Sequence, residues 1–291
     1  MPGSSGDESV PAPFDEHVET VERRIRRSRH VLCCLDFDGT LAPIVSDPDA
    51  ARILQPNRQA LERLVNNPAV TVAIVSGRGL DDLGDRIEAT VRLAGNHGLE
   101  IIRPIETVEG TELKRAIHPI AASASGAIAT CCGILSAILD PIPNARVEHK
   151  RLTGTVHYRD VPEPARPIVI SHVREIVERL GGRSLSVSTG KSIVEFGPAF
   201  DWGKGGAIEL FQRECPRETM TVFAGDDTTD EDGFETVEPD GFGVLVGSPR
   251  ASHASLRVDD PESLVDLLDV LDEATDRTAD RLTGCDRPTS E

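Results

Sequence analysis

The sequence predicts an α/β fold: a doubly wound, mostly parallel β-sheet of the Rossmann type with an inserted α+β domain. Short apolar runs, each typical of a strand buried on both faces, alternate with segments of helical periodicity. Several of these runs end directly in polar residues that can bind ligands or react. Functional groups of doubly wound sheets gather at the carboxyl ends of the strands, so the same pattern predicts a site along that edge.

The elements of the sheet domain follow this alternation along the chain. Strands are predicted at 31–35, 70–75, 91–94, 241–247 and in the segment 219–227, which ends in two acids. Helices are predicted at 15–29, 57–66, 79–90, 204–213 and 261–275. The last helix is strongly amphipathic, and its leucines predict a face packed on the sheet.

The middle of the chain has a different pattern. Helices are predicted at 108–140 and 164–180, and half-buried alternating strands at 145–149, 154–159, 184–188 and 192–196. We therefore expect a core formed by 15–107 and 197–276, interrupted by an α+β domain at 108–196. The tail 1–14 is rich in Pro, Gly and Ser and is expected to be disordered, and 277–291 forms a second tail.

The charge balance argues against several classes of partner. The 291 residues include 49 Asp and Glu against 31 Lys and Arg, a formal charge of −18. Such a surface repels nucleic acids and anionic lipids, so neither is expected as a partner. No apolar run approaches the 18 residues that predict a membrane span, and the first 30 residues lack the apolar run of a signal peptide. We expect a cytoplasmic protein and a monomer.

The basic residues and the cysteines add a prediction about the environment. Only four lysines stand against 27 arginines. The acid excess favours adaptation to high salt, whereas a GC-rich genome would explain the scarce lysines but not the net charge. None of the six cysteines forms a C-x-x-C pair. Free thiols in a reducing cytoplasm explain them most simply.

The segment Asp36-Phe37-Asp38-Gly39-Thr40 is the most informative motif. Alternate residues after a strand point the same way, so both carboxylates can enter one site. Two acids there suit a hard divalent cation, and one of them can attack phosphorus while the other moves protons. Gly39 allows a sharp turn, and the Thr40 hydroxyl can bond a phosphate oxygen. The alternative is an acidic loop that caps a helix.

A second acidic segment, at 226–232, holds five acids in seven residues. These acids would repel one another without a cation, which predicts metal binding. The spacing does not fit an EF-hand loop, because Glu231 stands where that loop needs Gly. In so acidic a chain, an incidental run of acids is the alternative.

Two further segments offer groups to an anion. Ser76-Gly77-Arg78 supplies a hydroxyl, backbone N–H groups and a guanidinium at another strand end. Lys204 opens a predicted helix, where the macrodipole disfavours a cation. Its position therefore predicts a nearby anion, although a solvated surface lysine is the simpler alternative.

Together these motifs resemble those of haloacid-dehalogenase-like (HAD) phosphohydrolases, and most closely those of the trehalose-6-phosphate phosphatase family. The resemblance rests on LDFDGTLAPI, VAIVSGR, GNHGLE, KRLTGTVHYR (150–159), GKSIVE (190–195) and GDDTTDEDGF, in this order along the chain. It implies a HAD-type core with an inserted cap. It also implies Mg²⁺-dependent hydrolysis of trehalose 6-phosphate to trehalose and phosphate through an aspartyl-phosphate.

The resemblance also implies a role for each matching residue in the core. Asp36 would be the nucleophile, and Asp38 would protonate the leaving oxygen and then activate water. Ser76 and Lys204 would hold phosphoryl oxygens. Thr40, Gly77 and Arg78 would add further contacts to the substrate. The Mg²⁺ ligands would be Asp36, the backbone carbonyl of Asp38 and Asp226, with Asp227 and Asp230 as auxiliary acids.

In the cap, five residues would face the disaccharide: Lys150, His157, Arg159, Lys191 and Glu195. Asn96 and His97 would line the hinge side. The chain departs from the family pattern at Thr153, where Ser is usual, and at Gly203, where an acid is often found. If that acid orients the lysine, Gly203 leaves Lys204 less constrained.

Other functions fit parts of the pattern. A related HAD phosphatase could act on sucrose phosphate or mannosyl-glycerate phosphate. A signalling receiver domain also has acids and a lysine at strand ends, but it lacks the D-x-D-G-T segment and a large inserted domain. A degenerate regulatory phosphatase domain is disfavoured because every motif position is filled.

Overall fold

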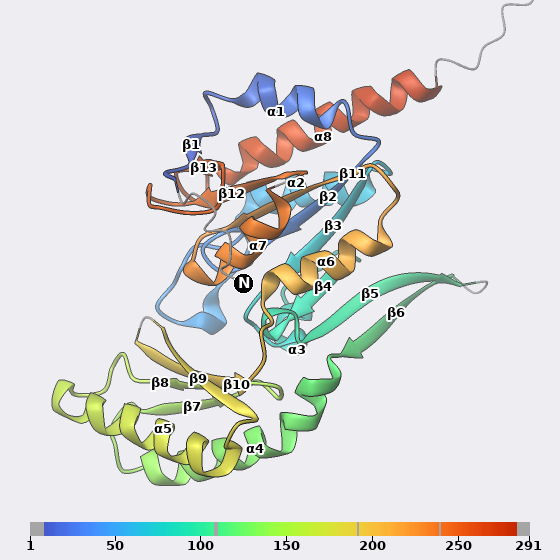
Figure 1. Cartoon of the computed structure of the whole chain (residues 1–291). Coiled ribbons are helices and arrows are strands. Elements are labelled where there is room, and N and C mark those ends of the chain that lie inside the picture. The colour runs from blue at the N-terminus through green and yellow to red at the C-terminus, as the bar shows by residue number, and fades with distance from the viewer. Residues whose placement is uncertain (1–8, 108–109, 191, 239, 284–291) are drawn as a thin grey trace, which may run out of the picture. The chain divides into compact units, whose positions relative to one another are not determined.

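The computed structural model describes residues 9–107, 110–190, 192–238 and 240–283. The chain divides into two compact units (Figure 1): Met1–Lys114 with Trp202–Glu291, and Arg115–Asp201. The larger unit contains a nine-stranded sheet, and the smaller one a four-stranded sheet. The mixed α/β architecture with a large parallel sheet confirms the predicted fold class.

The nine-stranded sheet has the order β1-β13-β12-β11-β2-β3-β4-β5-β6. The strands from β1 to β4 in this order run parallel, and β5 pairs antiparallel with β4. The bounds are β1 Ala12–Pro13, β2 His30–Leu35, β3 Val70–Val75, β4 Arg92–Gly95, β5 Glu100–Thr107, β6 Gly110–Ile117, β11 Thr219–Gly225, β12 Phe242–Val246 and β13 Leu256–Val258. Because β11, β2, β3 and β4 are neighbours, residues that follow these strands meet at one edge.

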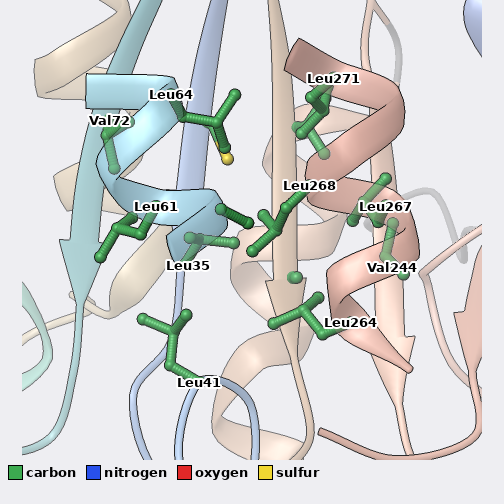
Figure 2. Packing of buried hydrophobic residues seen from close by; sticks show 14 of the residues in the cluster. Leu35, Leu41, Leu61, Leu64, Val72, Val244, Leu264, Leu267, Leu268 and Leu271 are labelled. Carbon is green, nitrogen blue, oxygen red and sulfur yellow. The ribbon is translucent and has the colours of Figure 1, made fainter. Parts of the chain in front are cut away.

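Helices cover both faces of this sheet. They are α1 Val18–Ile25, α2 Gln55–Asn66, α3 Leu80–Gly84, α6 Lys204–Glu214, α7 Glu231–Val237 and α8 Leu264–Thr283. Figure 2 shows leucines of α2 and α8 packed over Leu35 of β2 and Val244 of β12. The opposite face packs on α7, where the ring centroids of Phe223 and Phe234 lie 5.2 Å apart. Burial on both sides explains why these strands are continuous apolar runs in the sequence.

The ends of the larger unit differ from the prediction. The tail 1–14 was predicted to be disordered, but β1 pairs with β13 and the Phe14 side chain is buried. This pairing joins residues far apart in the chain, so no local pattern signals it. Residues 1–8 lie outside the described residues. At the other end, α8 continues to Thr283, beyond the predicted helix end at 275.

Two predicted helices are also wrong in extent. The helix predicted at 108–140 begins only at Pro119, and Gly110–Ile117 forms β6. Pairing with β5 decides the conformation of this polar segment, whereas Pro at the first helical position and the His118 side chain, which accepts from Ile120 N–H, start the helix. The helix predicted at 79–90 is reduced to α3, Leu80–Gly84, where Gly84 disfavours continuation.

The smaller unit is an antiparallel sheet with two helices. Its strands, in the order β7-β8-β10-β9, are β7 Arg146–His149, β8 Gly154–His157, β9 Leu185–Gly190 and β10 Ile193–Pro198. Val156, Val194 and Phe196 point to the face that packs on α4 (Pro119–Leu139) and α5 (Arg166–Gly181). The adjacent residues along these strands, Thr155 and Glu195, point to the other face. The sheet therefore has one apolar face and one polar face.

Helix α4 is the one helix in the described part of the chain that is long and apolar enough to cross a membrane, judged by length and composition. It has no charged residue over its 21 positions. Its Ile128, Cys131 and Leu135 are buried in the core of the smaller unit. The five cysteines that the structure describes are free thiols.

Candidate active site

The two acidic segments approach each other at the edge of the large sheet. Asp36 follows β2, and Asp226 follows β11, the strand that pairs with β2. Gly39 lies between them with φ of 79°, and a Cβ built there would lie 2.1 Å from a carboxylate oxygen of Asp226. Only glycine therefore allows the turn after β2 to lie against Asp226.

Lys204 is the buried cation of this site. At the start of α6, its Nζ lies 2.9 Å from Asp36 Oδ1 and 2.5 Å from Asp230 Oδ1. The Lys204 side chain is 2% exposed, so both ion pairs are shielded from water. The simpler alternative of a solvated lysine is wrong, because two carboxylates compensate the unfavourable position at a helix N-terminus.

Burial and mutual repulsion shift the ionisation of these groups. Burial raises the pKa of Asp36 well above its usual range, against the opposing charge of Lys204. Burial and the nearby charge of Asp230 raise the pKa of Asp226 to about 7. Although burial by itself lowers the pKa of Lys204, the charges of Asp230 and Asp36 outweigh it and raise that pKa. The acids therefore exceed what one lysine neutralises.

The carboxylates of Asp36, Asp226 and Asp230 form the one group of possible metal ligands in the described residues, with ligand oxygens within 4.8 Å of one another. Asp230 is occupied, because Oδ1 accepts from Lys204 and Oδ2 accepts from the N–H groups of Asp226 and Asp227. Asp36 and Asp226 remain for a cation. Two carboxylate ligands without nitrogen or sulfur suit a hard ion such as Mg²⁺. The donor set therefore fits the predicted metal.

Two neighbouring acids act on the backbone. Asp227 Oδ1 accepts from the N–H of Thr228, which makes Asp227 the cap of the turn Thr228–Asp230. Asp232 Oδ2 accepts from the N–H of Gly205, 2.9 Å away, at the start of α6. A Cβ at Gly203 would lie 2.1 Å from the same oxygen. Asp232 thus occupies the space of a side chain at 203, and Lys204 is constrained by Asp36 and Asp230.

The segment Ser76-Gly77-Arg78 follows β3 and contacts the turn after β4. Its backbone is fixed because His97 N–H donates to Ser76 O and Asn96 N–H donates to Arg78 O. A Cβ at Gly77 would lie 2.7 Å from the His97 ring, so the imidazole packs directly on this glycine. The structure thus brings Asn96 and His97 beside the segment predicted to bind phosphate.

A buried glutamate that the sequence analysis did not single out holds this turn. Asn96 and His97 have φ of 50° and 56°, a left-handed conformation that is costly for residues other than glycine. Glu100 is 2% exposed, and its Oε1 accepts from the Asn96 side chain at 2.7 Å and from the N–H of Leu80. Glu100 therefore ties the turn to the start of α3. It is the last residue of the GNHGLE segment.

Arg78 is bonded to the second acid of the D-x-D motif. Its Nε and Nη2 donate to both carboxylate oxygens of Asp38, at 2.6 and 2.7 Å. Nη1 donates to Asp82 at 2.7 Å, and Nη2 also donates to the carbonyl of Pro48 at 2.8 Å. Although burial by itself lowers the pKa of Arg78, these two carboxylates raise it. The Thr40 hydroxyl is buried without a hydrogen-bond partner among the described residues.

The polar face of the smaller sheet groups most of the residues predicted to face the sugar. Glu195 Oε1 accepts from Lys150 Nζ at 3.3 Å and from the Thr155 hydroxyl at 3.2 Å. His157 Nε2 lies 2.7 Å from Glu148 Oε2. Burial by itself raises the pKa of Glu148, but the bond with His157 and the charge of Lys150 outweigh it and lower that pKa. Glu148 and Thr155 are members of this face that the sequence analysis missed.

Arg159, Lys191 and Thr153 are the other positions of this unit that the family resemblance marks. Arg159 is exposed beyond the end of β8, where its carbonyl accepts from Arg166. Lys191 lies outside the described residues. Thr153 is buried in the turn between β7 and β8, and its carbonyl accepts from Lys150 N–H.

The sequence model of the family described as trehalose-phosphatase matches residues 34–262. This chain belongs to that family. Trehalose-phosphate phosphatase B of Arabidopsis thaliana is 30% identical over 267 residues, which are 89% of this chain and 69% of that protein. A protein of Mycobacterium tuberculosis named an uncharacterized glycosyl hydrolase is 33% identical over 279 residues, 92% of this chain but 20% of its own length. This chain thus spans a fifth of that relative.

Solved structures give the fold of this trehalose-phosphatase family member. The C-terminal domain of Candida albicans trehalose-6-phosphate phosphatase superposes with a TM-score of 0.71 at 21% identity, covering 91% of this chain and 99% of that one. A haloacid dehalogenase-like hydrolase from Bacteroides thetaiotaomicron gives a TM-score of 0.56 at 17% identity, over 82% and 98%. The fold is therefore HAD-like, as the motifs predicted.

Proposed function

We propose that this protein is a Mg²⁺-dependent phosphatase that hydrolyses trehalose 6-phosphate to trehalose and phosphate. The observation that carries the proposal is the buried group of Asp36, Lys204 and Asp226 at the ends of β2 and β11, in a chain of the trehalose-phosphatase family. Its relatives that bear the name trehalose-phosphate phosphatase supply the substrate.

The first step is transfer of the phosphoryl group to Asp36. An Asp36 carboxylate oxygen attacks phosphorus, the bond from phosphorus to the sugar oxygen breaks, and Asp38 gives that oxygen a proton. Lys204, Ser76 and the backbone N–H groups beside it hold phosphoryl oxygens as charge develops. Mg²⁺ held by Asp36 and Asp226 would neutralise phosphate charge and help to position the group.

The second step is hydrolysis of the aspartyl-phosphate. Asp38, now a carboxylate, takes a proton from a water molecule, whose oxygen attacks phosphorus. The acyl-phosphate bond breaks, so that phosphate leaves and the Asp36 carboxylate is restored. A receiver-like function is disfavoured. A receiver domain must keep its phosphoryl group, whereas Asp38 activates the water that hydrolyses it from Asp36.

The polar face of the smaller unit would bind the sugar. Glu195 and Lys150 together offer an acceptor and a donor to vicinal hydroxyls. His157, fixed by Glu148, offers a second polar group on the same face. Lys191 and Arg159 stay predicted contacts of the substrate.

The test is phosphate release from a panel of sugar phosphates. Trehalose 6-phosphate is expected to give the highest kcat/KM, and removal of divalent cations with EDTA is expected to abolish turnover. Sucrose 6-phosphate and mannosyl-3-phosphoglycerate are the matched competitors. A higher kcat/KM for either of them would contradict trehalose 6-phosphate as the substrate. Full activity in EDTA would contradict the dependence on Mg²⁺.

A further inference from the structure

The geometry points to Asp82 and Arg86 as positioning residues that act through Arg78 on Asp38. Arg78 was predicted to bind the substrate. The inference assigns its guanidinium instead to the orientation of the general acid, and it rests on the proposed function. The whole chain of contacts lies in the larger unit, between the turn after β2 and the segment around α3.

The donors of Arg78 are largely used within the protein. Of its five N–H groups, one on Nε and one on Nη2 bind Asp38, one on Nη1 binds Asp82, and the second on Nη2 binds the Pro48 carbonyl. The Arg78 side chain is 10% exposed. One N–H group remains for a substrate phosphate, whereas two others hold the carboxylate of Asp38. When Asp38 is protonated as the general acid, one of them still holds its carbonyl oxygen while the other oxygen carries the proton.

Asp82 and Arg86 hold the side of the Arg78 guanidinium that does not contact Asp38. Asp82 stands four residues later, on α3, and accepts from Arg78 Nη1 through Oδ2. The other oxygen of Asp82 accepts from Arg86 Nε at 3.0 Å and Nη2 at 2.7 Å. Arg86 Nη1 donates to the carbonyl of Ala51 at 2.8 Å. Asp82 therefore cannot turn away without breaking three hydrogen bonds.

The ring of Phe37 limits the guanidinium from one side. The Arg78 Cζ lies 5.2 Å from the centroid of that ring, which is buried. Phe37 stands between Asp36 and Asp38, so the same stacking fixes the backbone that carries both acids. The Asp38 carboxylate is the more exposed partner, with a side chain 36% exposed. Its direction thus depends on Arg78, and the direction of Arg78 depends on Asp82.

This arrangement predicts an effect that depends on the leaving group. A sugar oxygen needs a proton when its bond to phosphorus breaks, whereas p-nitrophenolate leaves without one. The ratio kcat/KM reports the steps up to departure of the leaving group and is independent of later hydrolysis of the aspartyl-phosphate. A misplaced Asp38 therefore lowers kcat/KM for the sugar phosphate and leaves the value for p-nitrophenyl phosphate much less affected.

The experiment compares Asp82→Asn with Asp85→Asn in the full chain. Both remove one charge from the same segment, and Asp85 is exposed and is not a partner of Arg78. We expect Asp82→Asn to lower kcat/KM for trehalose 6-phosphate about tenfold, through kcat rather than KM. This loss is smaller than the rate factor that a general acid supplies, because Asp38 itself is still present. Asp85→Asn is expected to stay within about twofold of the wild type.

Activity on p-nitrophenyl phosphate separates positioning from loss of the fold. An equal loss of kcat/KM on both substrates, or no loss on the sugar phosphate, overturns the inference. Arg78→Lys, which keeps the charge but not the two-pronged contact, is expected to show the same dependence on the leaving group. If the wild type prefers another sugar phosphate, the proposed substrate fails, and the same comparison on that sugar phosphate still tests Asp82.

Discussion

The two units hold their polar groups in different ways. In the larger unit, Asp36, Lys204 and Asp230 are buried at strand ends and neutralise one another only in part. In the smaller unit, Glu195 and Lys150 lie on the polar face of an antiparallel sheet, where they bind each other. Buried and incompletely paired charges are costly to fold and suit chemistry, whereas paired groups on a polar face suit recognition of hydroxyls.

The two units also differ in formal charge. Arg115–Asp201 contains ten Lys and Arg against eight Asp and Glu, which gives +2, so the rest of the chain carries −20 of the total −18. The acid excess therefore belongs to the larger unit alone. The smaller unit therefore does not repel a phosphorylated sugar, whereas the phosphoryl group itself needs the buried cation Lys204 of the larger unit.

The largest expected effect is the loss of kcat when the nucleophile Asp36 is replaced. Asp36→Asn is expected to lower kcat by about 10⁴-fold or more, because the amide is no nucleophile toward phosphorus. KM or substrate affinity changes much less than kcat, since Asn keeps the shape of the side chain and an oxygen toward the metal. Steady-state kinetics and isothermal titration calorimetry check both parts. Activity close to that of the wild type would contradict the assignment of Asp36.

Removing the second metal ligand is expected to abolish metal binding and to stabilise the metal-free fold. The pKa of Asp226 in the folded protein, about 7, lies above the 3.8 of an exposed carboxyl. Between these values the folded protein keeps a proton that the unfolded chain has lost, so this group's contribution to stability falls as the pH rises from about 4 to 7. At pH 8, Asp226→Asn should raise the Tm of the metal-free protein by about 5 °C.

The same titration predicts a pH dependence of metal binding. Protons compete with Mg²⁺ at Asp226, and the raised pKa of Asp36 adds to this competition, so the affinity for Mg²⁺ is expected to fall at least about tenfold for each pH unit below 7. Calorimetric titration with Mg²⁺ at pH 6, 7 and 8 measures this. An affinity that does not change with pH, or an Asp226→Asn variant that still gains stability from Mg²⁺, would contradict the two-carboxylate site.

A smaller and different effect is expected on the polar face of the smaller unit. Glu195→Gln keeps the shape but loses the charge that holds Lys150, so KM for trehalose 6-phosphate should rise about tenfold while kcat falls little. Turnover of p-nitrophenyl phosphate, which has no sugar, should be unchanged. Glu175→Gln, the same change at an exposed residue of α5 on the other side of the sheet, is the control. Equal losses on both substrates would mean that Glu195 supports the fold and not recognition.

The smallest effect concerns salt. If the acid excess of the larger unit is an adaptation to high salt, raising KCl should increase the Tm by a few degrees as repulsion among the carboxylates is screened. Differential scanning calorimetry over a KCl series checks this. A Tm that is constant or falls with KCl would leave the acidity without that explanation.

The sequence predicted the parts of the site that local patterns encode. Buried strands followed by Asp36, Ser76 and Asp226 are visible because each motif is continuous in the chain. The partners are not visible, because Asp38 meets Arg78, and Glu148 meets His157, only through the fold. Asp82 stands at helical spacing from Arg78, a signal that could have marked it. Strands β1, β5, β6 and β13 were missed. Pairing between segments far apart in the chain makes β1 and β13 strands, whereas β6 is a mostly exposed polar segment beside β5 and carries no apolar pattern.

Trapping the phosphorylated enzyme tests the aspartyl-phosphate mechanism directly. Asp38→Asn should slow hydrolysis of the aspartyl-phosphate, so the variant mixed with p-nitrophenyl phosphate and Mg²⁺ and quenched in acid should carry one phosphoryl group. Mass spectrometry of the peptides should place that group on Asp36. A burst of p-nitrophenolate with no phosphoryl group on Asp36, or with the group on another residue, would contradict the role of Asp36 as the nucleophile.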